Sequence, residues 1–158
     1  MKLKSPKLLF ISILASNLAG ILGSVATSAS ISDWYVYLEK PSFNPPNWIF
    51  GPVWTVLYTL MGIALYLVWS KGYKKTKVKN AVRLFFIHLM YNTLWTLVFF
   101  GSRNLLLALA VIIVLWLMIA SLIKIFWSID KRASYLLVPY ILWVSFATLL
   151  NYSIWRLN

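Results

Sequence analysis

The chain has 158 residues, of which 61% are hydrophobic and 11% are charged, whereas soluble domains average about 45–50% apolar and about 25% charged residues. This composition excludes a soluble globular domain, and the absence of cysteine excludes a disulfide framework and a thiolate metal site. One histidine and three acidic residues leave almost no basis for a conventional catalytic grouping, so the net charge of +12 is the next feature to explain.

Five apolar segments are long enough to cross a bilayer, which takes about 20 residues per helix. The connections between them are too short to form a further domain. The sequence therefore predicts one all-α membrane domain over residues 1–158, a five-transmembrane-helix bundle with a structured loop between helices 1 and 2. The predicted helices span residues 8–26, 48–69, 81–100, 105–127 and 135–155.

The first predicted helix carries small residues at helical spacing, namely Ser12, Ser16, Gly20 and Ser24. Small residues let neighbouring membrane helices approach closely, so we expect this face to pack inside the bundle, with a dimer contact as the alternative. The basic start of the chain also resembles a secretory signal peptide. The apolar run over residues 8–26 exceeds the usual signal core of about 7–15 residues, and we expect this helix to be retained.

The connection over residues 27–47 is too apolar for a solvated linker, because it contains Trp34, Tyr35 and Phe43. Its prolines also restrict the backbone. We predict an ordered lid over one mouth of the bundle, whose opening controls access to a pocket beneath it. Asn47, at the end of the connection, is suited to cap the second helix.

Positive charge falls on one side when the five segments alternate across a membrane. Lys40, Arg103 and Arg156 lie on one side, and the other 12 of the 15 basic residues lie opposite. This is the positive-inside pattern. It predicts a multi-pass protein of the cell membrane with a cytoplasmic N-terminus and an outside C-terminus, and it removes the need for a nucleic-acid partner. Attraction of the basic side to anionic lipids is an additional role that this pattern allows.

Aromatic and polar residues share helix faces that we expect to converge under the lid, forming an apolar slot typical of small-molecule sites. The alternative is that the tryptophans belong to the bundle core or to the interfacial belt, to which we assign those at the segment ends. The residues on the converging faces are Trp54 and Tyr58 in the second predicted helix, His88, Asn92 and Trp95 in the third, and Trp143, Ala147 and Asn151 in the fifth.

A set of proline and tryptophan motifs runs in order along most of the chain. Together these motifs resemble the TspO/MBR family, the tryptophan-rich sensory and translocator proteins, also described as peripheral-type benzodiazepine receptors. The motifs are Trp34-Tyr35, Lys40-Pro41-Ser42, Pro45-Pro46-Asn47-Trp48, Gly51-Pro52-Val53-Trp54, Asn92 with Trp95, Phe99-Phe100-Gly101-Ser102-Arg103, Pro139-Tyr140 and Asn151-Tyr152.

The resemblance implies a membrane receptor for porphyrins, acting in porphyrin sensing or regulation and often forming a homodimer. Its ligand would be protoporphyrin IX, haem or another flat hydrophobic molecule, with no cofactor required and no metal site. Two alternatives stay open: light-dependent degradation of protoporphyrin, with Trp54 and Trp143 as the catalytic pair, and passive translocation of the ligand. The resemblance adds ligand contacts from the lid, at Trp34, Tyr35 and Pro41, to those from the converging faces.

Three positions depart from the family pattern. His88 stands where the family commonly has glutamine, Phe43 where a tryptophan is usual, and Val111 where many relatives carry an acidic residue. We interpret His88 as a hydrogen-bonded packing residue, with ligation of haem iron as the alternative. The absence of an acidic side chain within the predicted helices disfavours proton-coupled transport, which normally uses ionisable groups inside the membrane.

Overall fold

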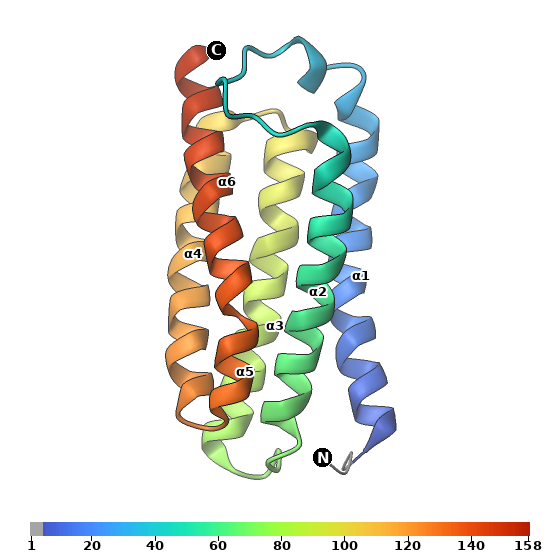
Figure 1. Ribbon diagram of the computed structural model, residues 1–158, viewed down its shortest axis with the longest axis vertical. Coiled ribbons are helices and arrows are strands. Elements are labelled where there is room, and N and C mark those ends of the chain that lie inside the picture. The colour runs from blue at the N-terminus through green and yellow to red at the C-terminus, as the bar shows by residue number, and fades with distance from the viewer. Residues whose placement is uncertain (1–4) are drawn as a thin grey trace.

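The computed structural model describes residues 5–158, apart from the side chain of Ala29, and every regular element in this part of the chain is helical (Figure 1). Five of its helical spans are long and apolar enough to cross a membrane, which confirms the predicted architecture. The long helices are α1 (Pro6–Ile31), α2 (Asn47–Trp69), α3 (Thr76–Thr96), α4 (Leu105–Trp127) and α6 (Val138–Leu157), and the short elements are η1 (Tyr35–Tyr37), the π-helical η2 (Leu97–Gly101) and α5 (Lys131–Leu136).

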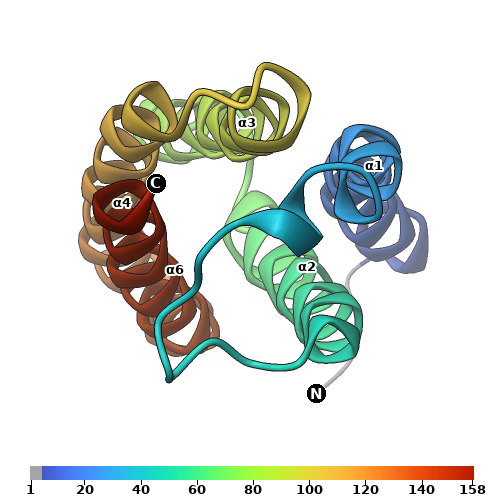
Figure 2. The same ribbon diagram turned by 90° about the horizontal axis from the view of Figure 1, so that it is seen from above.

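The helices follow one another around the bundle in the order α1, α2, α6, α4, α3 when it is viewed along its axis (Figure 2). Extensive contacts join α1 to α2, α3 to α4 and α4 to α6, whereas α2 and α6 hardly touch. The short α5 packs against α2 at one end of the bundle. The segment between α1 and α2, residues 32–46, crosses the other end and is called the lid below.

Several helices extend beyond the limits predicted from the sequence. Helix α1 continues to Ile31 instead of ending at residue 26, and α3 begins at Thr76 instead of residue 81. Hydropathy detects the part of a helix that suits hydrocarbon, and the remaining turns continue as helix into the polar interface. Asn47 is not the cap that we expected, because Pro46 holds that position and no side chain caps the first turn of α2.

The last predicted helix, residues 135–155, is in fact two helices. Helix α5 begins after Asp130, whose side chain accepts a hydrogen bond from the backbone N–H of Arg132. Leu137 separates α5 from α6, two residues before Pro139, which lacks the N–H needed to continue the helical hydrogen bonding. Despite this break, α5 and α6 together make up the last membrane span, Lys131–Leu157.

The half of the bundle that lies away from the lid is solidly packed. Its core side chains have no exposed surface, among them Met61, Leu65, Phe85, Leu115 and Phe126. Here α1 and α2 cross at Gly62, where a β-carbon would lie 2.5 Å from the Cα of Ile13 and 2.9 Å from the carbonyl oxygen of Ser12. Ser12 and Ser16 are fully buried beside this crossing, so this part of the small-residue face packs inside the bundle.

The two ends of the bundle differ in charge, as predicted. The start of α1, the α2–α3 connection and the α4–α5 connection gather at the end opposite the lid, which we call the basic end (Figure 1). Lys2 and Lys4, which were assigned to this side, lie outside the described residues. Asp130 pairs here with Lys71 and Arg132, with an N···O distance of 2.9 Å in each case. The Arg132 guanidinium and the Lys71 ammonium hold the pKa of Asp130 well below its usual range.

Candidate functional site

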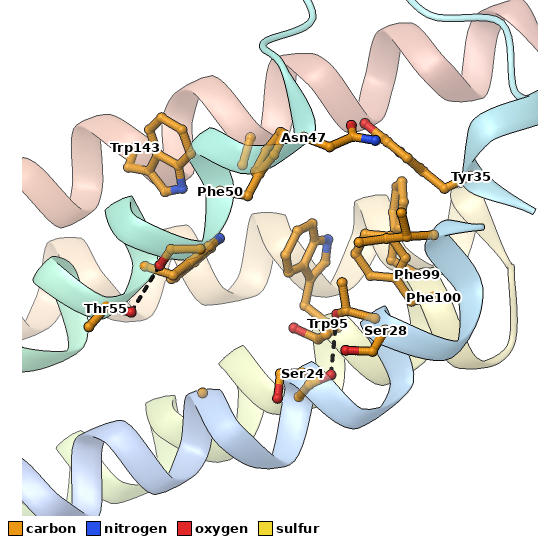
Figure 3. Close-up of a pocket in the computed structure, with 18 of the residues that line it drawn as sticks. Ser24, Ser28, Tyr35, Asn47, Phe50, Thr55, Trp95, Phe99, Phe100 and Trp143 are labelled. Carbon is orange, nitrogen blue, oxygen red and sulfur yellow. Dashed lines mark hydrogen bonds between the residues drawn. The ribbon is translucent and has the colours of Figure 1, made fainter.

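A cavity of about 520 Å³ occupies the half of the bundle nearest the lid (Figure 3). Its walls come from α1, α2, the end of α3 with η2, and α6, and Tyr35 of the lid closes it from above. Binding sites for drug-sized molecules usually measure about 300–1,000 Å³. The cavity therefore has the size of a small-molecule site, and it lies entirely above the packed half of the bundle.

A group of packed aromatic rings forms part of the inner wall, with Trp54 at their centre. The Trp54 ring stacks on Tyr58, with centroids 5.5 Å apart and an interplanar angle of 29°. It also lies 6.4 Å from the Trp95 ring and 6.2 Å, edge-on, from Tyr140. These are favourable aromatic geometries. Each ring is held by its neighbours, so the wall presents fixed π-surfaces to the cavity.

Hydrogen bonds below and beside these rings keep them in position. The hydroxyl of Tyr58 donates to Oδ1 of Asn92, whose Nδ2 donates to the Tyr140 hydroxyl at 3.0 Å. Nε1 of Trp95 donates to Oδ1 of Asn151 at 3.2 Å, and Nδ2 of Asn151 donates to a backbone carbonyl of α4. Both amides therefore position aromatic side chains. They are less free to recognise a ligand than the sequence suggested.

Trp143 differs from the other polar aromatic residues of the wall. Its Nε1 is buried and has no hydrogen-bond partner among the described residues, and Figure 3 shows the nitrogen on the cavity side of the ring. The ring itself packs against Phe50 and Phe146, with centroids 5.9 and 5.5 Å away. An unpaired buried N–H is costly, and among the described residues nothing offsets this cost at Trp143.

The lid is ordered by side-chain contacts, as its composition predicted. Tyr35 is 5% exposed and packs against Phe99 and Phe100 of η2. Its hydroxyl donates to Oδ1 of Asn44 at 3.0 Å, and burial raises the pKa of Tyr35 to about 12. Trp34 packs edge-on against Phe99. The lid is thus part of a second hydrophobic core.

The structure brings most of the predicted site residues together and separates four of them. Trp34, Pro41, His88 and Asn92 do not line the cavity. His88 is fully buried beside Phe85, its Nδ1 is hydrogen-bonded to the Phe85 carbonyl, and its Nε2 has no partner among the described residues. An imidazole in this position does not face a haem placed in the cavity. The predicted residues that do line the cavity are Tyr35, Trp54, Tyr58, Trp95, Trp143, Ala147 and Asn151.

One wall of the cavity was not predicted, namely the lid-end half of α1. The small residues of α1 were expected to serve helix packing, and near the lid they have a second role. A β-carbon on Gly20 would meet the Tyr58 ring at 2.2 Å, and one on Gly23 would approach Thr96 at 3.2 Å. The sequence pattern that could have indicated this wall is the regular spacing of small residues along α1. The lining residues from this wall are Asn17, Gly20, Ile21, Gly23, Ser24, Thr27, Ser28 and Ile31.

Comparisons with known proteins identify the family. A sequence model of the TspO/MBR family matches residues 12–156. The tryptophan-rich protein TspO of Chlorobaculum tepidum is 47% identical over 88% of this chain and 88% of its own length, and that of Archaeoglobus fulgidus is 44% identical over 93% and 94%. The human translocator protein is 36% identical over 92% of this chain and 86% of its own length. Five membrane-spanning helices, an aromatic cavity beneath a proline-rich lid and these similarities together place the chain in the TspO/MBR family.

Proposed function

We propose that this protein is an integral membrane receptor that binds a porphyrin, or another flat hydrophobic molecule, in the cavity beneath the lid, and that it acts in porphyrin sensing or regulation. The observation that carries the proposal is the wall of fixed aromatic rings around Trp54. A flat macrocycle gains from offset stacking and edge contacts with such a wall. A porphyrin also supplies acceptor atoms for the unpaired indole N–H of Trp143.

Light-dependent degradation of a bound porphyrin is the second candidate, and the position of two tryptophans favours it. Trp54 and Trp143 both line the cavity, within reach of an excited ligand. In this reaction the excited porphyrin would accept an electron from a tryptophan, and dissolved dioxygen would serve as the oxidant that opens the macrocycle, so the proposal assigns no conventional acid, base or metal to the protein. Trp54 also contacts the rings of Tyr58, Trp95 and Tyr140, which connects it to further aromatic residues.

Passive translocation receives less support from the packing. The cavity lies in the lid-end half, and the other half of the bundle is filled by side chains with no exposed surface, such as Leu65, Phe85 and Phe126. A ligand crossing the membrane through the bundle would have to displace this core. A receptor that signals through its ligand-bound state does not require the ligand to pass through this core.

We propose that the protein lies in the cell membrane with its basic end in the cytoplasm and its lid outside. The charge difference between the two ends supports this orientation. Haem is an alternative ligand, held in this proposal by stacking and not by His88, which does not line the cavity. A homodimer is the proposed assembly, in keeping with the family resemblance.

The absorption spectrum of the purified protein with protoporphyrin IX, recorded in the dark and then under illumination, tests these candidates. A red-shifted, stable spectrum that titrates to one site supports the receptor. Loss of the porphyrin bands with a new product supports degradation. A spectrum identical to that of free porphyrin in the same detergent would refute porphyrin binding. The matched control is the double variant with Trp54→Ala and Trp143→Ala, which should bind weakly in the dark.

A further inference from the structure

The exposed part of the cavity wall is confined to two helices. All lining residues from the lid, α3, η2 and α6 are buried or half-buried. The cavity therefore opens sideways between α1 and α2, at the depth of the bilayer half nearest the lid. The exposed lining residues are Ile21, Ser24 and Ser28 of α1 and Asn47, Trp48, Gly51 and Thr55 of α2.

The opening arises because α1 and α2 diverge towards the lid. They pack closely at Gly62, where a β-carbon would meet the backbone of Ile13. Gly51 lies three turns nearer the lid, about 16 Å along α2 at 1.5 Å per residue. There a β-carbon would meet no atom of another element within 4 Å. The cavity wall is therefore open beside Gly51, on the side that faces the surrounding lipid.

Two hydroxyl side chains on the rim of this gap are hydrogen-bonded within their own helices. The hydroxyl of Ser24 donates to the carbonyl oxygen of Ile21 at 2.7 Å, and that of Thr55 donates to the carbonyl oxygen of Gly51 at 2.9 Å. Because these small hydroxyl side chains are satisfied within their own helices, they need not be dehydrated when a ligand passes. No ion pair among the described residues crosses the gap.

The lid, by contrast, is tied to α6. Oδ1 of Asn158 accepts a hydrogen bond from the backbone N–H of Glu39 at 3.0 Å, and Nδ2 of Asn158 donates to the Glu39 carbonyl at 3.0 Å. Phe43 adds an edge contact with Phe146 of α6, at 6.3 Å between centroids. These contacts of Glu39 with Asn158 and of Phe43 with Phe146, which we call the latch, hold the side of the lid that lies away from η2.

The lid is also tied within itself and to η2. Nζ of Lys40 donates to the carbonyl oxygens of Val36 and Leu38 and lies 4.9 Å above the Tyr35 ring. Tyr35 in turn packs on Phe99, beside the cavity. Raising the lid would break the latch and separate these rings in one step, whereas sideways passage through the gap breaks none of them.

We propose that the lid is a fixed roof and that flat hydrophobic ligands exchange with the surrounding lipid through the gap between α1 and α2. The inference rests on the proposed function, since it concerns the same cavity. It replaces the expectation from sequence that opening of the lid controls access. Hydrophobic ligands concentrate in the bilayer, so an opening at that depth receives them where they are most abundant.

The experiment compares two obstructions, using protoporphyrin IX exchanged between lipid vesicles and the protein in lipid nanodiscs, followed by porphyrin fluorescence. Glu39→Cys with Asn158→Cys allows a disulfide that locks the lid, and the chain has no other cysteine. The same sample measured after reduction is its control. Gly51→Phe places a ring in the gap, and Val56→Phe, on an exposed position of α2 that does not line the cavity, is the matched control.

The oxidised lid variant should exchange porphyrin within about twofold of its reduced form. Gly51→Phe should slow association and dissociation alike by about tenfold, with a nearly unchanged dissociation constant, because an obstruction in a passage affects both directions. Val56→Phe should match the native chain in both rates.

Slow exchange in the oxidised lid variant, or native rates in Gly51→Phe, would overturn the inference while leaving the proposed function intact. Weakened affinity in Gly51→Phe without slower dissociation would also count against it, because the ring would then act inside the cavity and not in the gap. If the native chain binds no porphyrin, the proposed function fails and the inference fails with it.

Discussion

Trp143 offers a test that separates ligand recognition from packing. Its buried indole N–H lacks a partner in the described part of the chain, and an unpaired buried donor costs about 1–3 kcal/mol. Replacing Trp143 with Phe removes this donor and also removes apolar area worth about 1 kcal/mol. Because the two effects oppose each other, Trp143→Phe should change the free energy of unfolding of the ligand-free protein by less than about 1 kcal/mol in the destabilising direction.

Trp143→Phe should weaken ligand binding, although it leaves the stability of the ligand-free protein nearly unchanged. If the N–H donates to an acceptor on the porphyrin, Trp143→Phe loses a hydrogen bond worth about 1–1.5 kcal/mol, which is about five- to tenfold in affinity. Trp143→Ala also removes the ring and should cost a further 1–3 kcal/mol or so. Thermal unfolding in one detergent gives the stability, and a titration with protoporphyrin IX in the dark gives the affinity.

Native porphyrin affinity in Trp143→Phe, together with a loss of more than about 2 kcal/mol of stability, would refute a ligand-binding role for the indole N–H. That outcome would show that the indole serves packing against Phe50 and Phe146. Under light, phenylalanine keeps an aromatic face but is a much poorer electron donor than indole. Any light-dependent porphyrin loss should therefore fall sharply in this variant, even at saturating ligand.

Asp130→Asn should lower the free energy of unfolding by only about 1–2 kcal/mol at pH 7, because Lys71 and Arg132 are partly exposed to water. Since folding lowers the pKa of Asp130, its stabilising effect should be complete at neutral pH and should fade below about pH 4. Unfolding temperatures measured over a pH series would contradict this if those of Asp130→Asn and of the native chain fell in parallel. Gly62→Ala should destabilise the protein by about 1–3 kcal/mol, because the added carbon meets the backbone of α1. Gly51→Ala, whose β-carbon meets no other element and crowds only the following Pro52, should change the stability by less than about 1 kcal/mol, so equal unfolding temperatures for the two alanine variants would disprove the close crossing. Single cysteines at Thr76 and Asn158 should react with a membrane-impermeant thiol reagent from the inside and from the outside respectively, and outside labelling at Thr76 would reverse the proposed orientation.

The sequence by itself determined the number of membrane spans and the segregation of charge. Both properties can be counted from short stretches of sequence. A span needs a sufficient run of apolar residues, and the charge of a connection does not depend on how the helices pack. The fourth helix illustrates this, since Leu105–Trp127 coincides with the predicted segment. A short polar turn precedes it and Ser128 follows it, so both of its ends were marked in the sequence.

The tertiary structure decided which residues of a helix face reach the cavity. His88 and Asn92 share a face with Trp95, yet only Trp95 lines the cavity. Helical spacing fixes the direction of a side chain but not the depth at which the neighbouring helices close over it. Tyr140, a fully buried side chain on α6, contacts the His88 ring and accepts a hydrogen bond from Asn92, and both residues lie in the packed floor.

The role of the small residues on α1 was likewise decided by the partner helix. Near the basic end they meet the backbone of α2 and allow a close crossing at Gly62. Near the lid, where α1 and α2 diverge, Ser24 and Ser28 instead border an open gap. The same spacing of small residues serves both a close helix crossing and an open gap, because a small side chain permits another helix to approach but does not require it. Whether another helix fills that space depends on the angle at which α1 and α2 cross, which no segment of the sequence encodes alone.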